Sequence, residues 1–163
     1  MKQAAIIFFI LLLGTMACQQ EQTKSKAKAF KALLDQYYED RLKLYPLEAT
    51  ASGDDRYNDL LPNNGSAEFM RQEHEFYQKY LGELLSYDRA SLSSNDQLSF
   101  DILKHTLEIA LESERYHFEY IPFEQMNSLP LFMGQLGAGD GMQPFKTEKD
   151  YYNFLKRMDK YSA

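Results

Sequence analysis

Apolar side chains recur at steps of three and four residues through most of this chain, and that spacing places them on one face of an α-helix. The first such stripe comprises Phe30, Leu33, Leu34, Tyr37, Tyr38, Leu42 and Tyr45. No segment shows a convincing alternation of apolar and polar residues, which would predict a half-buried strand. The sequence therefore predicts an all-α fold, a bundle of about four to five long amphipathic helices.

Turn and capping residues predict where these helices begin and end. Pro46 in a first helical turn and Gly53 just past the last turn predict a short helix over residues 46–52. Residues 54–65 are rich in Asp, Asn, Pro and Gly and predict a loop, and Ser66 is a predicted N-cap. The next stripe comprises Phe69, Phe76, Tyr77, Tyr80, Leu81, Leu84 and Leu85.

The helix expected from Asp96 to about Phe118 is the most apolar of the set. Its apolar positions are Leu98, Phe100, Ile102, Leu103, Leu107, Ile109, Ala110 and Leu111. They cover more than half of the helix circumference, so we expect this helix to be buried between neighbours. Residues 122–145 are interrupted by proline and glycine and are expected to be irregular.

A last helix is predicted after Thr147, an expected N-cap with Asp150 in the capping-box position. Its stripe comprises Tyr151, Phe154, Leu155, Met158 and Tyr161. Apolar periodicity continues to Tyr161, and the preceding long helix needs neighbours on several sides. Both features predict that this is the N-terminal part of a larger helical protein, the alternative being a helix that frays at a natural terminus.

The first eighteen residues have the organisation of a secretory signal. Lys2 is followed by an apolar run from Ala4 to Leu13, then by small or apolar residues, and then by Cys18, which is the only cysteine. This arrangement resembles the lipobox of bacterial lipoproteins, although Thr15 replaces the more usual Leu or Val. The run is shorter than the roughly 20 residues that span a bilayer. We expect lipidation of Cys18 and anchoring to a membrane facing the periplasm or the exterior; a secreted protein with a free thiol is the alternative.

This interpretation divides the chain into a signal peptide (1–17), a polar tether (18–28) and a helical domain (29–163). No cysteine remains for a disulfide. Loss of Lys2 with the signal changes the formal net charge from −6 to −7. Such a charge argues against nucleic acid as a partner and against adhesion to anionic lipid, and it is compatible with a cation or a basic peptide.

Asp101, His105, Glu108 and Glu112 are the strongest candidates for chemistry. Steps of four, three and four residues place them on one polar arc of the third long helix. An imidazole with carboxylates suits a divalent metal or acid–base work. The alternative is a solvated strip with an Asp101–His105 pair, and we adopt it because amphipathic helices need such strips. We therefore predict no catalytic residue and no metal ligand in this chain.

Two further segments resemble known motifs incompletely. His74-Glu75-Phe76-Tyr77-Gln78 is close to the zinc-binding H-E-x-x-H helix, but Gln78 replaces the second histidine. We interpret this segment as the polar edge of an amphipathic helix. The glycine-rich residues 136–141 follow no strand and lack the sequence of a phosphate-binding loop, so they predict a flexible connection.

One segment resembles a known family. Tyr45–Gly53, followed by Tyr57-Asn58-Asp59 and Leu61-Pro62, is similar to the opening of the family called domain of unknown function 885. Pro144–Thr147, leading into Asp150-Tyr151, agrees as well, and the similarity extends from about Phe30 to the end of the chain.

The resemblance implies an all-helical bacterial protein, often lipidated and much longer than this chain. It further implies a zinc-dependent, peptidase-like hydrolase whose metal site lies in a C-terminal part. No position here matches that part of the pattern, so the resemblance implies an N-terminal fragment without catalysis of its own. Zinc and a peptide substrate are expected for the full-length parent. The alternative is a complete small helical lipoprotein that acts as a binding module of the envelope.

Overall fold

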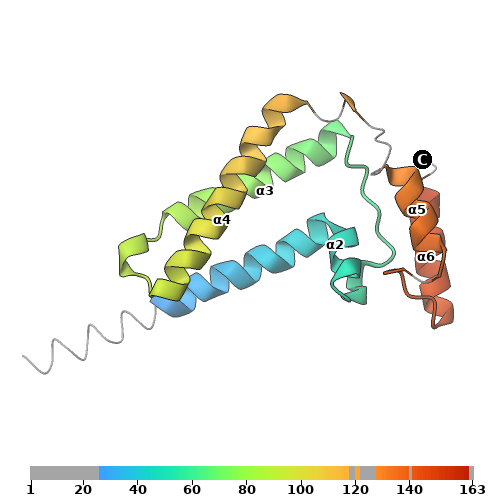
Figure 1. Cartoon of the computed structure of the whole chain (residues 1–163), viewed down its shortest axis with the longest axis horizontal. Coiled ribbons are helices and arrows are strands. Elements are labelled where there is room, and N and C mark those ends of the chain that lie inside the picture. The colour runs from blue at the N-terminus through green and yellow to red at the C-terminus, as the bar shows by residue number, and fades with distance from the viewer. Residues whose placement is uncertain (1–25, 118–119, 122–127, 140, 162–163) are drawn as a thin grey trace, which may run out of the picture.

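The computed structural model describes residues 26–117, 120–121, 128–139 and 141–161, and every regular element in these ranges is helical. The long helices are residues 26–44, α3 (Ala67–Leu85), α4 (Ser94–Ser113), α5 (Leu129–Gly137) and α6 (Glu148–Tyr161). The first three of these share one core, whereas α5 and α6 lie together at the other end of the molecule (Figure 1). The all-α prediction is confirmed.

A short helix and several turns connect these elements. The connecting elements are α2 (Pro46–Ala51) and the 3-10 turns Asp55–Tyr57, Arg89–Ser91 and Glu114–Tyr116. The first helix already includes residues 26–28, which the sequence assigned to a tether. The signal peptide and Cys18 lie outside the described residues. None of the described helices combines the length and apolar composition needed to cross a bilayer.

The predicted caps are confirmed by hydrogen bonds and backbone angles. Ser66 Oγ accepts from the backbone N–H of Phe69 at 3.1 Å. Gly53, just after α2, has a φ of +79°, a conformation that glycine adopts without the strain of a Cβ atom. Asp150 Oδ2 accepts from the backbone N–H of Thr147 at 2.8 Å, as a capping box requires. These starts and stops are local features that the sequence could predict.

The core of the first group of helices is formed by apolar and aromatic side chains. Its buried members are Phe30, Leu33, Tyr77, Tyr80, Leu84, Leu92, Phe100, Leu103 and Leu107. Tyr37 stacks on Phe76 with ring centroids 5.5 Å apart, and this contact joins the first helix to α3. The stripes of residues 26–44 and of α3 therefore pack as their periodicity predicts.

The prediction that residues 122–145 are irregular is wrong for α5. Pro130 lies in the first turn of that helix, where a missing N–H costs nothing. Leu136, in the segment interpreted as a flexible connection, is 1% exposed and packs with Met133 and Leu61. A Cβ at Gly137 would lie 3.0 Å from Cζ of Phe154, so glycine there permits the close approach of α5 to α6. Tertiary packing stabilises a helix whose local signals favour a loop.

The expectation that α4 is buried between neighbours is also wrong for the described residues. Leu98 and Ile102 are each 58% exposed, and only Phe100, Leu103 and Leu107 are buried. The helix begins at Ser94 and ends at Ser113, before the expected residue 118. His117 then takes a left-handed φ of 50°, which ends the helical path.

The last helix, α6, buries only part of the apolar stripe that its sequence predicts: Phe154 packs against the cluster of Leu61, Met133 and Leu136. Tyr151 and Leu155 are more than half exposed, whereas Asn153 and Arg157 are buried. Arg157 donates hydrogen bonds to Thr50 Oγ1 at 2.7 Å, to the carbonyls of Tyr57 and Leu60 at 3.1 Å, and to Gln143 Oε1. Burial lowers the pKa of Arg157 to about 10, against the opposing charge of Asp59, so the side chain is a cation at neutral pH. These bonds orient the polar face of α6 inward.

A buried tyrosine and an aspartate join α3 to the first helix, and they predict an acid-sensitive contact. The Tyr80 hydroxyl donates to Asp40 Oδ2 at 2.5 Å. Burial alone would raise the pKa of Asp40, but hydrogen bonds from Tyr80, Gln36 and Lys79 outweigh it and lower the pKa to about 2. Since this value is below that of the unfolded chain, the stabilisation is present above about pH 4 and is lost as the pH falls toward about 2.

Tyr80→Phe should therefore raise the pKa of Asp40 and lower the free energy of unfolding at pH 7 by about 1 kcal/mol. The variant should also lose less stability than the wild type between pH 7 and acid, because part of the pH-dependent contact is already gone. Urea unfolding at pH 7 and at an acid pH below about 4 measures the free energy of unfolding of each protein. Tyr38→Phe, at a residue 51% exposed, is the matched control. If the free energy of unfolding changes with pH equally in Tyr80→Phe and the wild type, the Tyr80–Asp40 hydrogen bond is not the source of the acid sensitivity.

Candidate binding cavity

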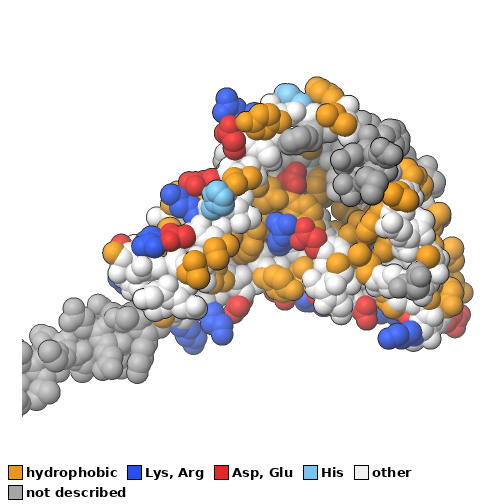
Figure 2. Space-filling model, viewed as in Figure 1, with side chains coloured by type: hydrophobic (Ala, Val, Ile, Leu, Met, Phe, Trp, Pro, Cys, Tyr) orange, Lys and Arg blue, Asp and Glu red, His pale blue; other side chains and the backbone are white. Residues whose placement is uncertain are grey.

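A cavity of about 1030 Å³ is lined by residues of the first group of helices and of the α5–α6 pair. Its walls come from α2, the loop over residues 61–65, α3, the end of α4, the start of α5 and the end of α6. In the space-filling view the molecule is hollowed between the two groups, and apolar side chains gather there and over α5 and α6 (Figure 2). The volume is at the upper end of the roughly 300–1,000 Å³ typical of ligand sites.

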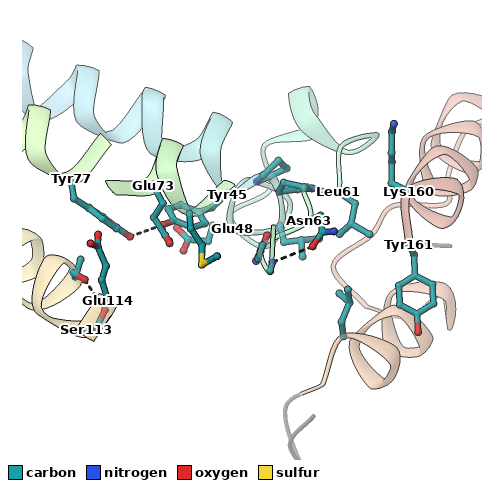
Figure 3. A pocket seen from close by; sticks show the side chains of 18 of the residues that line it. Tyr45, Glu48, Leu61, Asn63, Glu73, Tyr77, Ser113, Glu114, Lys160 and Tyr161 are labelled. Atoms are coloured by element: carbon teal, nitrogen blue, oxygen red, sulfur yellow. Dashed lines mark hydrogen bonds between the residues drawn. The ribbon is translucent and has the colours of Figure 1, made fainter. Parts of the chain in front are cut away.

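One wall carries a hydrogen-bonded chain of two tyrosines and a glutamate (Figure 3). Tyr45 follows the first helix, while Glu73 and Tyr77 are four residues apart on α3. The Tyr45 hydroxyl donates to Glu73 Oε1 and lies 2.6 Å from the Tyr77 hydroxyl. Because Tyr45 uses its single proton on Glu73, Tyr77 is the donor to Tyr45.

The electrostatics of this chain keep Tyr45 protonated. Burial raises the pKa of Tyr45 far above its ordinary value, and the hydrogen bonds with Glu73 and Tyr77 raise it further. The Arg41 guanidinium lies 4.8 Å from the centroid of the Tyr45 ring. Tyr45 is therefore a fixed donor that orients the Glu73 carboxylate, not a base.

The cavity is lined by three glutamates that have different partners. Glu48 accepts two hydrogen bonds from Arg41, at 2.7 and 2.8 Å. Glu114 lies 2.8 Å from Nδ1 of His74. Within the described part of the chain, Glu73 forms no ion pair and its Oε2 accepts no hydrogen bond. Glu73 thus presents an uncompensated carboxylate oxygen beside the cavity.

The opposite wall differs from the tyrosine wall. Lys160 and Tyr161 of α6 lie across the cavity from Glu73 and Tyr77 (Figure 3). Apolar side chains fill much of the remaining lining; they include Leu47, Leu61, Pro62, Met70 and Leu129. A mixed lining of this kind suits a ligand with an aliphatic body and a polar group that fixes its orientation.

The structure places the predicted polar strip of α4 away from this cavity, with each carboxylate beside its own cation. Asp101 pairs with Arg89 at 2.7 Å, Glu108 with Lys104 at 3.5 Å, and Glu112 with Arg115 at 2.8 Å. Asp101 therefore pairs with Arg89 and not with His105, which is exposed. The described ranges contain no group of three or more His, Cys, Asp or Glu side chains that could hold a metal ion. That this strip binds no metal stays a prediction.

In the near match to the zinc-binding helix, His74 and Glu75 both have partners within the protein. Glu75 pairs with Arg71 at 2.6 Å, and His74 bonds to Glu114 on another helix. Sequence reasoning missed Glu73, the neighbour of His74. The spacing of Glu73 and Tyr77 shows that they share a helix face, but nothing local indicates that Tyr45 completes the group from a distant position.

The fold and the cavity define a helical protein with a ligand-sized cavity that residues of both groups of helices line. The family described as "Bacterial protein of unknown function (DUF885)" matches residues 46–163, most of the chain. The protein therefore belongs to the DUF885 family. The match begins at Pro46 and not near Phe30, as the resemblance suggested. No curated protein and no solved structure matches the chain significantly.

Proposed function

We propose that this protein is a lipid-anchored member of the bacterial envelope that binds a ligand in the cavity beside Glu73. The cavity carries this proposal, because its volume and its mixed polar and apolar lining are those of a ligand site. The chain supplies binding and not catalysis. We assign the zinc-dependent, peptidase-like chemistry to a full-length parent protein, acting there on a peptide substrate.

The anchor rests on the sequence before the first described helix. A charged start, an apolar run and Cys18 support export followed by lipidation at that cysteine. Several acyl chains would hold the protein firmly at the membrane, whereas one chain binds only marginally. The polar residues after Cys18 would then separate the lipid from the helices.

Cys18→Ala should abolish incorporation of labelled fatty acid and move the protein from the membrane fraction to the soluble fraction. The thiol is the acceptor of the lipid, and alanine cannot replace it. Thr23→Ala, in the adjacent polar segment, is the control and should keep both properties. If the Cys18→Ala protein still sediments with membranes to the wild-type extent, the anchor is wrong.

A complete small binding module of the envelope is the second candidate, because the described residues line a cavity of ligand size. Circular dichroism and sedimentation of residues 18–163 carrying Cys18→Ser distinguish a complete binding module from the N-terminal region of a longer protein. A cooperative thermal transition of a monomer supports a module that folds alone. A broad transition with aggregation supports a region that needs further residues, because exposed apolar faces then remain uncovered.

A further inference from the structure

We propose that the cavity binds a primary ammonium group on an aliphatic stem, with Glu73 as its counter-ion. This inference rests on the binding role proposed above and specifies its ligand. Glu73 is the starting point because its charge is met by a hydroxyl and not by a cation within the described residues. Of the remaining glutamates of the cavity, Glu48 pairs with Arg41, and Glu114 lies 2.8 Å from Nδ1 of His74.

The orientation of the Glu73 carboxylate leaves one oxygen for a ligand. Oε1 accepts from the Tyr45 hydroxyl, which is held in turn by Tyr77. Oε2 has no partner in the described part of the protein. A hydrogen bond from a ligand cation to this oxygen would be charge-assisted, the stronger class of hydrogen bond.

The walls around Glu73 suit an aliphatic ammonium better than a metal ion or an anion. A metal would require further oxygen or nitrogen ligands directed at one point, and the nearby Glu48 is already occupied by Arg41. An anion placed beside Glu73 would be repelled by its carboxylate, whereas the cationic Lys160 lies on the opposite wall of the cavity. Leu61 and Met70 line the same cavity and would contact an apolar stem.

Two sources could supply this chemistry: a free alkyl amine, or a lysine side chain of a peptide. Calorimetric titration of the detergent-solubilised protein should use cadaverine, pentanediol and glutarate, which share a five-carbon chain and differ in charge. A capped lysine dipeptide tests the peptide source. We expect cadaverine, the dipeptide or both to bind roughly tenfold or more tightly than pentanediol, and glutarate to show no binding, because a charge-assisted contact is at stake.

Glu73→Gln should reduce binding of the ammonium ligand to the level of pentanediol. Glutamine keeps an oxygen that can accept from Tyr45, so the wall should persist; an unchanged thermal melt checks this. Glu75→Gln is the matched control, because Glu75 lies on the same helix, pairs with Arg71 and does not line the cavity. It should bind like the wild type.

Three results would overturn the inference: equal binding of cadaverine, dipeptide and pentanediol, preferential binding of glutarate, or ammonium binding that Glu73→Gln leaves intact. Its failure is distinguishable from failure of the anchor. If the wild-type protein is labelled with lipid at Cys18 but does not bind the ammonium ligands, only the proposed ligand is wrong. If the wild-type protein binds the ammonium ligands but is not lipidated, only the proposed lipid anchor is wrong.

Discussion

Replacement of Arg157 by alanine should lower the free energy of unfolding by about 3 kcal/mol. Arg157 has no exposed surface and joins α6 to α2 and to the loop that follows α2. Its removal leaves the buried Thr50 hydroxyl and the Leu60 carbonyl with fewer donors, and each lost buried partner costs about 1 kcal/mol or more. Relief of the buried charge offsets part of the loss.

Lys156→Ala is the matched control for Arg157→Ala. Lys156 precedes Arg157 on α6, but its side chain is 62% exposed and pairs with Asp59 at 3.1 Å. An exposed pair of this kind contributes about 0–1 kcal/mol. Urea unfolding at pH 7 compares the two variants, and hydrogen exchange of the α6 amides shows whether the helix opens separately. A loss for Arg157→Ala no larger than that for Lys156→Ala, with α6 still protected, would contradict the assigned role.

Leu107→Ala should destabilise the first group of helices by about 3 kcal/mol, the range for a fully buried leucine that leaves a cavity. Leu107 has no exposed surface and lies in the core shared by residues 26–44, α3 and α4. Neighbouring backbone cannot easily collapse into the space, because three helices meet there. Thermal and urea unfolding measure the loss.

Ile109→Ala provides a control on the same helix. Ile109 is 53% exposed, so its truncation should cost about 0.5 kcal/mol, as for most surface substitutions. Both changes create alanine in the middle of α4, so helix propensity contributes similarly to each. Equal losses for the two variants would show that the outer face of α4 is also packed in solution, as its apolar composition led us to expect.

Local signals in the sequence predicted the long helices other than α5, and many of their ends. The caps at Ser66 and Asp150 and the glycine after α2 depend on residues within a few positions of each other. The stripes of the first helix and α3 were equally readable, because their apolar faces pack as periodicity requires. Family membership was also predicted from the segment that begins near Pro46.

Other features could be decided only by tertiary structure. The sequence does not show that α5 forms, because its proline and glycines favour a loop until Leu136 packs against Leu61. It does not show that Arg157 is buried, since a cation on an amphipathic helix ordinarily faces water. Acceptors about a hundred residues away, including the Thr50 hydroxyl, reverse that preference.

For the candidate site too, the sequence shows some features, and only the tertiary structure shows the others. The sequence by itself determined that Glu73 and Tyr77 share a face of a helix, because a four-residue step is about one turn. Only the folded chain brings Tyr45 onto Glu73 and places α6 across the cavity from them. The physical reason is that helical periodicity orients side chains around one axis, whereas the meeting of different helices depends on packing and buried hydrogen bonds between distant residues.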